Sequence, residues 1–379
     1  MNRHKMAAVG GATALALLLS ACGGGETDST SPGTNDNQAS GDDCSIAPIL
    51  EEVEGLDADA RADKLKDLAA DESKEIQIYG SLGADEVDAI VADFSKQQGV
   101  KITTFSANSE EVLQRLGSEE QAGRTQGDIF ENNGTELQLA SQEGLLAQVT
   151  SPHAEALAEE VVYPTWVGNR YNVFTVLLNP AALGGVEPPK TYGDLADPKY
   201  DGLLGVEAGN WDHFATMVKY MQEKEGMSEE EAIDVWRDIT SGARVFTSNT
   251  PLAEGVEQGE LGAGITYNHY YSRFVGRGSK NIQWEPAIEP QVLRPNGVGI
   301  PCSAPNPATA LLLFDFFISK EGQEILGEVS NRDVTHPEVK AGLLPGTDYE
   351  KVYMDLREVI SESDKWVPIW DELIRNASK

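Results

Sequence analysis

Two adjacent tyrosines, Tyr270 and Tyr271, are the residues whose type and spacing first suggest chemistry. They follow Asn268 and His269 at the end of an apolar run, Gly262–Tyr267, that predicts a strand. Phenolate oxygens suit a hard, highly charged ion such as Fe(III), whose field removes phenol protons that otherwise leave only at about pH 10. Adjacent residues of a regular strand point to opposite faces, so both reach one ion only where the strand has ended or bent. The tyrosines could instead pack in a core, or stack their rings against an organic cation.

No motif of an enzyme active site accompanies these tyrosines. The sequence contains no GxSxG elbow, no HExxH pair and no phosphate-binding P-loop. The five histidines stand apart, at positions 4, 153, 213, 269 and 336, and no CxxC or Cys/His spacing indicates zinc. We therefore predict no enzyme, no catalytic residue and no catalytic cofactor; the less favoured alternative is a secreted enzyme whose site is assembled from distant residues and leaves no local motif.

The N-terminus predicts an exported lipoprotein. Arg3 and Lys5 precede an apolar run, Met6–Leu19, and the run ends in the letters LSAC at Cys22. A basic head, a run of about 14 apolar residues and small residues before a cysteine are typical of a lipoprotein signal peptide, and the run is short for a membrane span. An ordinary anchor helix would not require those small residues. We expect cleavage after residues 1–21 and lipidation of Cys22, on the outer face of the cytoplasmic membrane.

The next residues predict a tether and a disulfide. Residues 22–43 contain no large apolar side chain and are rich in Gly, Ser, Thr and Asp, a composition typical of a flexible coil. With Cys22 lipidated, Cys44 and Cys302 are the two remaining cysteines. An even pair outside the cytoplasm indicates one disulfide, and the alternative is two buried free thiols.

The charge balance is strongly acidic. The chain carries 29 Lys and Arg against 62 Asp and Glu, a net charge of −33. Removing residues 1–21, which hold two basic and no acidic residues, changes this value to −35. Such a surface repels nucleic acid and anionic lipid, so we predict no nucleic-acid partner. The same balance is a common solubility feature of exported proteins and does not identify a ligand.

The body of the chain predicts an α/β fold. A strand at 75–80, a helix at 85–98 and a strand at 100–105 form a strand-helix-strand unit, which implies a parallel pair. About 335 residues exceed one comfortable core, so two lobes are expected, with a ligand crevice at the carboxyl ends of the parallel strands. The alternation continues through strands at 128–130, 173–178 and 262–267 and helices at 109–122, 136–143, 211–225, 228–240 and 251–258.

Four segments resemble the solute-binding proteins of ABC importers. Pro188–Val206, PPKTYGDLADPKYDGLLGV, resembles a signature of that family, and Glu254–Tyr271, Gly297–Pro301 and Asn306–Leu326 follow in the family's order. The likeness is closest to the branch that binds ferric iron, with thiamine, polyamine and aminophosphonate binders as neighbours. It implies a type II-like periplasmic-binding-protein fold, in which two lobes joined by crossover strands close over a ligand.

The resemblance also implies an organisation and partners. Lobe 1 would span 75–174 and be completed by about 300–330, and lobe 2 would span 175–299 and be completed by about 331–379. Residues 44–74 would form an N-terminal helical extension. The expected partners are a membrane permease and its ATPase, a small ligand or metal ion, and the membrane itself through the lipid, with the chain a monomer.

The ferric branch implies metal ligands at particular positions. Its tyrosine pair corresponds to Tyr270 and Tyr271, which would supply two phenolates to Fe(III) as the transported ligand. A carboxylate is expected from Glu131, although a strict match places the acidic position nearer Asn133. An anion, His269 or water would complete such a site.

The branch also implies a site for a small anion beside the metal. Asn249 and Asn268 occupy positions where the branch holds that anion, and Arg170 is a further candidate. Trp211 and Asp212 stand at a helix start where the family has small hydroxyl and glycine residues. Asp212 would repel an anion there, and its alternative role is a helix cap.

These departures support a second hypothesis, in which the cleft binds an organic cation such as a polyamine or thiamine. Trp211, Tyr270 and Tyr271 would then form stacking walls, and Glu131 and Asp212 would pair with the positive charge. The two hypotheses differ in whether the phenols act as oxygen ligands or as ring faces.

Overall fold

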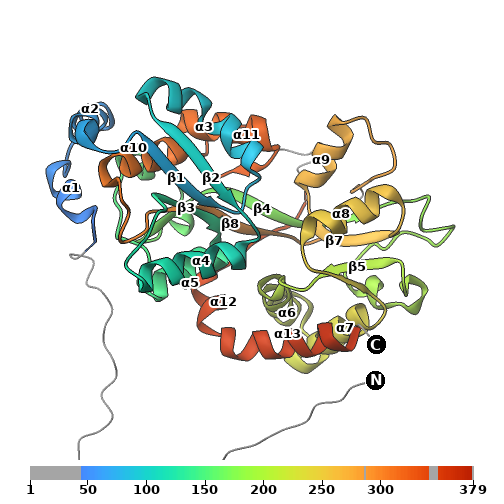
Figure 1. Ribbon diagram of the computed structural model, residues 1–379. Helices are drawn as coiled ribbons and strands as arrows, with labels where there is room; N and C mark the ends of the chain where they lie inside the picture. Colours follow the sequence, from blue (N-terminus) through green and yellow to red (C-terminus); the bar gives the residue numbers. More distant parts are fainter. Residues whose placement is uncertain (1–43, 286, 341–348, 378–379) are drawn as a thin grey trace, which may run out of the picture. The chain divides into compact units, whose positions relative to one another are not determined.

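The computed structural model describes residues 44–285, 287–340 and 349–377 as two α/β lobes that share one sheet (Figure 1). The predicted signal peptide, the lipidation site Cys22 and the tether lie outside the described residues. Within the ranges described, no helix is both long and apolar enough to cross a membrane. The two-lobed fold class predicted from the sequence is confirmed by this arrangement.

One sheet runs through both lobes. Its strand order is β2-β1-β3-β8-β4-β7-β5-β6, with β10 paired to β8 and β9 to β4. The strands are β1 (Glu75–Gly80), β2 (Lys101–Ser106), β3 (Ile129–Asn133), β4 (Trp166–Leu178), β5 (Leu204–Glu207), β6 (Arg244–Phe246), β7 (Ala263–Tyr267), β8 (Gln291–Gly299), β9 (Asp333–Val334) and β10 (Lys351–Tyr353).

Lobe 1 is built on β1, β2 and β3, which are mutually parallel as the strand-helix-strand pattern predicted. Helices cover both faces of these strands, which is why their apolar residues are buried. Along α3 the apolar side chains recur at helical spacing and all four are buried: Val87, Ile90, Val91 and Phe94. The helices of this lobe are α3 (Ala84–Gln98), α4 (Ser109–Gln121), α5 (Gly134–Gln142), α10 (Pro307–Ile318) and α11 (Lys320–Ser330).

Lobe 2 is built on β5, β6 and β7, with β5 parallel to both of its neighbours. In Figure 1, α8 and α9 lie on one side of these strands and α6 and α7 on the other. The predicted capping box is present, with Ser228 and Glu231 each satisfying a backbone N–H at the start of α7. The helices are α6 (Trp211–Glu225), α7 (Glu229–Ser241), α8 (Asn249–Gln258) and α9 (His269–Gly276).

Strands β4 and β8 cross between the lobes. They are antiparallel to each other, and β8 pairs with β3 in lobe 1 while the last five residues of β4 pair with β7 in lobe 2. The backbones approach so closely that a Cβ on Gly297 would lie 2.0 Å from the carbonyl oxygen of Val167. The predicted boundary between the two lobes, after residue 174, therefore falls inside β4, a strand that both lobes share.

The N-terminal extension is fastened to lobe 1. It contains α1 (Ala47–Glu52) and α2 (Ala58–Leu68), which lie beside α10 in Figure 1. The predicted disulfide between Cys44 and Cys302 is confirmed. Arg61 of α2 pairs with the buried Asp315 of α10 at 2.7 Å. The carboxylate of Glu72 accepts the first free N–H groups of α10, from Ala308 and Thr309.

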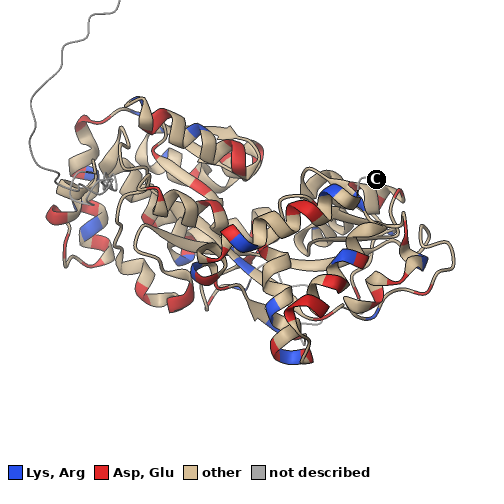
Figure 2. Cartoon of the chain, turned by 90° about the horizontal axis from the view of Figure 1, so that it is seen from below, with Lys and Arg blue, Asp and Glu red and all other residues tan. Residues whose placement is uncertain are grey.

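The C-terminal helices contact both lobes. Helix α12 (Leu356–Ser361) packs against α5 and α6, and α13 (Ser363–Ala377) packs against α6 and α7. The rings of Trp366 and Trp370 lie 5.9 and 5.3 Å from the ring of Phe214. Acidic residues are distributed over the helices of both lobes, with fewer basic residues among them (Figure 2). Short 3-10 helices occupy Ala69–Asp71, Pro152–Ala156, Glu159–Val161, Gly193–Ala196 and Pro198–Tyr200.

Candidate functional site

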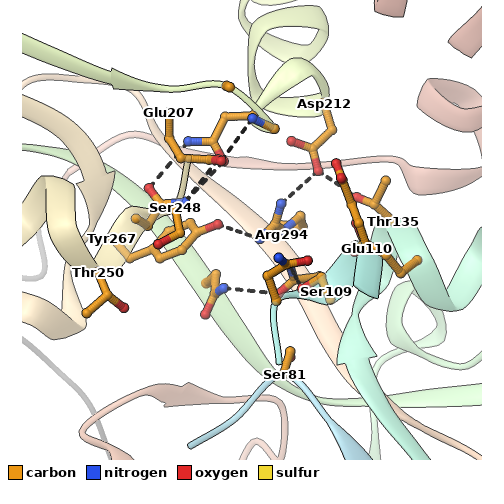
Figure 3. Close-up of a pocket in the computed structure, with 18 of the residues that line it drawn as sticks. Ser81, Ser109, Glu110, Thr135, Glu207, Asp212, Ser248, Thr250, Tyr267 and Arg294 are labelled. Atoms are coloured by element: carbon orange, nitrogen blue, oxygen red, sulfur yellow. Dashed lines mark hydrogen bonds and ion pairs between the residues drawn. The ribbon is translucent and has the colours of Figure 1, made fainter. Parts of the chain in front are cut away.

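A cavity of about 650 Å³ is lined by strands, helix starts and loops of both lobes (Figure 3). Its walls are formed by residues that follow β1, β2 and β3 in lobe 1 and β5, β6 and β7 in lobe 2. These are the carboxyl ends of parallel strands, where the crevice of an α/β protein is expected. Polar lining residues include Ser81, Ser109, Glu110, Thr135, Glu136, Arg170, Glu207, Asp212, Ser248, Asn249, Thr250, Tyr267, Tyr270, Arg294, Arg332 and Asp371.

Arg294 of β8 lies at the centre of the cavity wall (Figure 3). Its guanidinium pairs with Asp212 at 2.9 Å and donates to the Tyr267 hydroxyl at 2.6 Å. The same cation lies over the rings of Phe174 and Tyr267. Asp212 also accepts a hydrogen bond of 2.6 Å from Thr135. The charge of Arg294 is therefore neutralised by the protein itself.

The other two arginines of the cavity are paired as well. Arg170 forms a buried ion pair with Glu131. Arg332 pairs with Glu86 of α3 and lies 3.4 Å from Nε2 of His269. Burial and the neighbouring Arg332 hold the pKa of His269 well below its usual value, so Nε2 of the neutral ring accepts this hydrogen bond.

Four carboxylates of the cavity have no such partner. Among the described residues, Glu110, Glu136, Glu207 and Asp371 line the cavity without forming an ion pair to a basic side chain. Burial raises the pKa of Glu136 and of Glu207 to about 7, because their charged forms are poorly solvated. With all three arginines paired, the net charge of the cavity's side chains is negative, and it grows more negative as Glu136 and Glu207 lose their protons around pH 7, so the cavity suits a positively charged ligand.

Glu207 is the most enclosed of these four carboxylates. It ends β5 and is only 9% exposed. One carboxylate oxygen accepts the N–H of Gly209 at 2.9 Å, and the other accepts Nδ2 of Asn249 at 3.3 Å. The amides of Asn249 and Asn210 hydrogen-bond to each other. Neutral donors therefore fix both oxygens of Glu207.

The two predicted tyrosine ligands point in different directions. Tyr270 lines the cavity, and its hydroxyl lies 2.9 Å from the hydroxyl of Thr250. Tyr271 lies outside the lining, with its ring centre 6.5 Å from that of Trp284. Strand β7 ends at Tyr267 and α9 begins at once, so the two tyrosines stand in the first turn of a helix, where successive side chains diverge by about 100°.

Glu131, the predicted carboxylate ligand, lies beneath the cavity wall. It is fully buried and accepts hydrogen bonds from the backbone N–H groups of Ser81 and Leu82 as well as from Arg170. It is not part of the lining. The structure therefore joins Glu131 to Arg170, two residues that the sequence assigned to separate metal and anion roles.

The remaining predicted residues divide between the cavity and its surroundings. Asn249 and Asp212 line the cavity, and Asp212 is paired with Arg294. Asn268 lies behind the lining and donates to Asp333 at 2.9 Å. Trp211 opens α6 but does not line the cavity, so no aromatic wall forms from it.

Several lining residues carried no recognisable sequence motif. Glu207 directly follows the apolar residues 203–206, and Arg294 interrupts an apolar run in β8. A charge at either place is a signal, because a charged residue in or just after a buried strand requires a partner or a function. Thr135 and Tyr267 gave no such signal.

The cavity offers both phenol and carboxylate oxygens as potential metal ligands. Within the part of the chain that the structure describes, no three His, Cys, Asp or Glu side chains are grouped closely enough to hold a metal ion. A metal bound here would therefore need phenol oxygens in addition to carboxylates. Tyr270 and Glu207 flank the same helix turn, since Tyr270 contacts Thr250 and Glu207 contacts Asn249.

Comparison with known proteins gives a family and two relatives that are named for iron. The model of the family described as bacterial extracellular solute-binding protein matches residues 129–353. The Fe(3+)-binding periplasmic protein of Serratia marcescens is 26% identical over 274 residues, 68% of this chain and 78% of that protein. Iron uptake protein A1 of Synechocystis is 24% identical over 277 residues, 68% of this chain and 74% of that protein.

Solved structures share the fold. Iron-bound HitA from Pseudomonas aeruginosa superposes with a TM-score of 0.67 at 19% identity, covering 79% of this chain and 99% of HitA. AfuA from Actinobacillus pleuropneumoniae, solved with fructose-6-phosphate, gives 0.70 at 20% identity, covering 80% of this chain and 99% of AfuA. At these identities the likeness establishes the two-lobed fold, and the two bound ligands differ in charge.

Proposed function

This chain belongs to the bacterial extracellular solute-binding proteins, and we propose that it captures ferric iron outside the cytoplasm and delivers it to the permease of an ABC importer. Two relatives over about two thirds of the chain are named for iron binding or uptake. The chain carries no P-loop, so ATP hydrolysis would belong to a separate subunit.

The observation that carries the proposal is the charge balance of the cavity. Each of its arginines is paired with a carboxylate of the protein, while among the described residues Glu110, Glu136, Glu207 and Asp371 form no ion pair with a basic side chain. A trivalent cation would relieve the repulsion among these groups. An anionic cargo would add to it.

The proposed ligands begin with Tyr270, the phenol that faces the cavity. Bound Fe(III) would displace its proton, although burial raises the pKa of the free phenol, because the ion's own charge outweighs the cost of burial. Tyr271 and Glu131 would have to leave Trp284 and Arg170 before they could bind cargo. Their part in the site stays a proposal that depends on movement of α9 and β3.

Visible spectroscopy tests the proposal. Purified protein is titrated with chelated Fe(III), and wild type is compared with Tyr270→Phe and Tyr271→Phe. We expect a broad phenolate-to-iron charge-transfer band in wild type and its loss in Tyr270→Phe. Tyr271→Phe reports whether the second phenol joins once iron is bound: an unchanged band means one phenolate, and a shifted or lost band means two.

Two outcomes would contradict the proposal. The absence of any band, together with no protein-bound iron after gel filtration, would remove ferric iron as cargo. A full band in Tyr270→Phe would leave iron as cargo but remove this phenol as its ligand. Exposed Tyr353 is the matched control, because it lies outside the cavity and Tyr353→Phe should leave the band unchanged.

The size of the cavity favours a second candidate, an organic cation. About 650 Å³ exceeds what a single ion fills and is typical of small-molecule sites. A ligand at 100 times its dissociation constant raises the unfolding free energy by about 2.7 kcal/mol, so thermal melts detect it. A melting shift with a polyamine or thiamine, and none with Fe(III), would establish this candidate.

The proposed location requires the lipid anchor on Cys22. Replacing Cys22 with alanine should move the protein from the detergent phase to the aqueous phase in a detergent partition experiment. A wild-type protein that already partitions into water would contradict lipidation and leave the cargo proposal intact.

A further inference from the structure

Glu207 occupies a set of donors that is built for an anion. Its two carboxylate oxygens accept the backbone N–H of Gly209 at 2.9 Å and the side-chain amide of Asn249 at 3.3 Å. Asn249 is oriented in turn by the amide of Asn210. Backbone and amide N–H groups that converge on one carboxylate form an anion pocket, and here the protein's own side chain fills it.

Glu207 occupies the donors that an external anion would need. A Cβ on Gly209 would lie 3.2 Å from Glu207, so the loop passes close against the carboxylate. An incoming anion would have to compete for the same donors and would meet the charge of Glu207 at short range. The positive charges of the cavity's arginines are already compensated, because Arg170, Arg294 and Arg332 are each paired with a carboxylate.

The same carboxylate and the proposed metal ligand Tyr270 are contacted by consecutive residues of one helix. Asn249 and Thr250 are consecutive residues in the first turn of α8; Asn249 holds Glu207 and Thr250 contacts the hydroxyl of Tyr270. Glu207 and Tyr270 therefore approach the cavity from two sides of one helix turn. Glu207 is 9% exposed and belongs to the lining of the cavity.

We propose that Glu207 is a cargo-binding carboxylate that takes the place of an external anion, so that Fe(III) is held without a small-molecule anion beside it. The inference rests on the proposed function, because it assumes a metal cargo. It specifies more than that function does, since a ferric receptor could equally require phosphate, carbonate or citrate at this position.

The test compares iron binding with and without added anions. Wild type, Glu207→Gln and Glu207→Ala are loaded with Fe(III) from a chelate, freed of chelator by gel filtration in a buffer without phosphate, carbonate or citrate, and assayed for bound iron and the visible band. Glu207→Gln removes the charge and keeps the shape, and Glu207→Ala also vacates the donors. Glu254→Gln, at an exposed position on α8 outside the cavity, is the control.

We expect wild type and Glu254→Gln to retain iron in the anion-free buffer, with an affinity that added phosphate leaves unchanged. Both Glu207 variants should bind iron about 10- to 100-fold more weakly there, as is usual when a group that supports a metal site is lost. Added phosphate or carbonate should restore much of that loss in Glu207→Ala, because the freed donors can then hold the anion.

The possible failures are distinguishable. Wild type that binds iron only with an added anion, or Glu207 variants that bind as tightly as wild type, would overturn the role of Glu207 and leave the ferric cargo in place. Wild type that binds no iron in any buffer would overturn both. If Glu207→Ala does not fold, Glu207→Gln still shows whether the negative charge of residue 207 is needed for iron binding without an added anion.

Discussion

Thr135 in the first turn of α5 donates a hydrogen bond of 2.6 Å to Asp212 in the first turn of α6, and so links lobe 1 to lobe 2. Asp212 pairs at the same time with Arg294 of the crossover strand β8. Thr135 is 3% exposed and Asp212 is fully buried. One buried carboxylate thus joins both lobes and the strand between them.

Replacing Thr135 with valine should lower the free energy of unfolding by about 1–3 kcal/mol, because the buried carboxylate of Asp212 loses a donor. Urea denaturation measures the change. Thr104→Val is the matched control, since the Thr104 hydroxyl has no hydrogen-bond partner among the described residues and its loss should be nearly neutral. Equal effects of the two substitutions would show that the bond between the lobes does not contribute.

The ion pair between Arg61 and Asp315 should hold the N-terminal extension to lobe 1. Arg61→Ala leaves a buried carboxylate unpaired and should cost about 3–5 kcal/mol in unfolding free energy. Replacing both residues, Arg61→Met with Asp315→Leu, should recover most of that loss, because no buried charge remains. If the double variant is as unstable as Arg61→Ala, the loss of stability comes from losing the ion pair itself and not from leaving the Asp315 carboxylate buried without a partner.

The disulfide should stabilise the protein through the unfolded state. Cys44 and Cys302 are 258 residues apart, so their bond restricts a very long loop of the unfolded chain. Replacing both cysteines with serine should lower the unfolding free energy by about 3–5 kcal/mol. Wild type unfolded in the presence of a reductant should match the variant, and a reduced wild type as stable as the oxidised form would contradict the prediction.

His213 should make the protein less stable in acid. Its ring is 1% exposed and stacks on Phe174 at 4.3 Å, and burial lowers its pKa from 6.5 to about 3. Between pH 6.5 and about pH 3, His213 binds a proton in the unfolded chain but not in the folded chain. The unfolding free energy contributed by this residue is therefore complete above about pH 6.5 and falls by about 1.4 kcal/mol per pH unit below it.

The measurement is urea denaturation of wild type and His213→Phe at pH 7.5, 6.0 and 5.0. Every other titrating group is common to the two proteins, so the difference in slope reports His213 alone. We expect the unfolding free energy of wild type to fall more steeply than that of the variant below pH 6.5. Parallel slopes would show that the pKa of His213 is the same in the folded and the unfolded protein, and would contradict the prediction.

The local elements were predictable from the sequence because their signals are local. The apolar residues of α3 recur every three or four positions, and β1 and α6 span the predicted residues. The capping box at Ser228 is a short-range pattern of the same kind. The disulfide followed from counting cysteines in an oxidising compartment.

The site was less predictable because its contacts join distant residues. Glu131 meets Arg170 39 residues later, and Glu207 meets Asn249 42 residues later. No periodicity reveals such pairs. The direction of Tyr271 depends on α9 beginning directly after β7, and element boundaries are the least certain part of any sequence interpretation.

The bond between Cys44 and Cys302 also decides how mechanical load would enter the molecule. Cys302 lies between β8 and α10, within lobe 1. Tension applied to the chain before Cys44 would pass through a covalent link straight into that lobe, without peeling α1 or α2 away. If the chain before Cys44 is anchored to a membrane as proposed, lobe 1 is the lobe that this covalent link would hold in place.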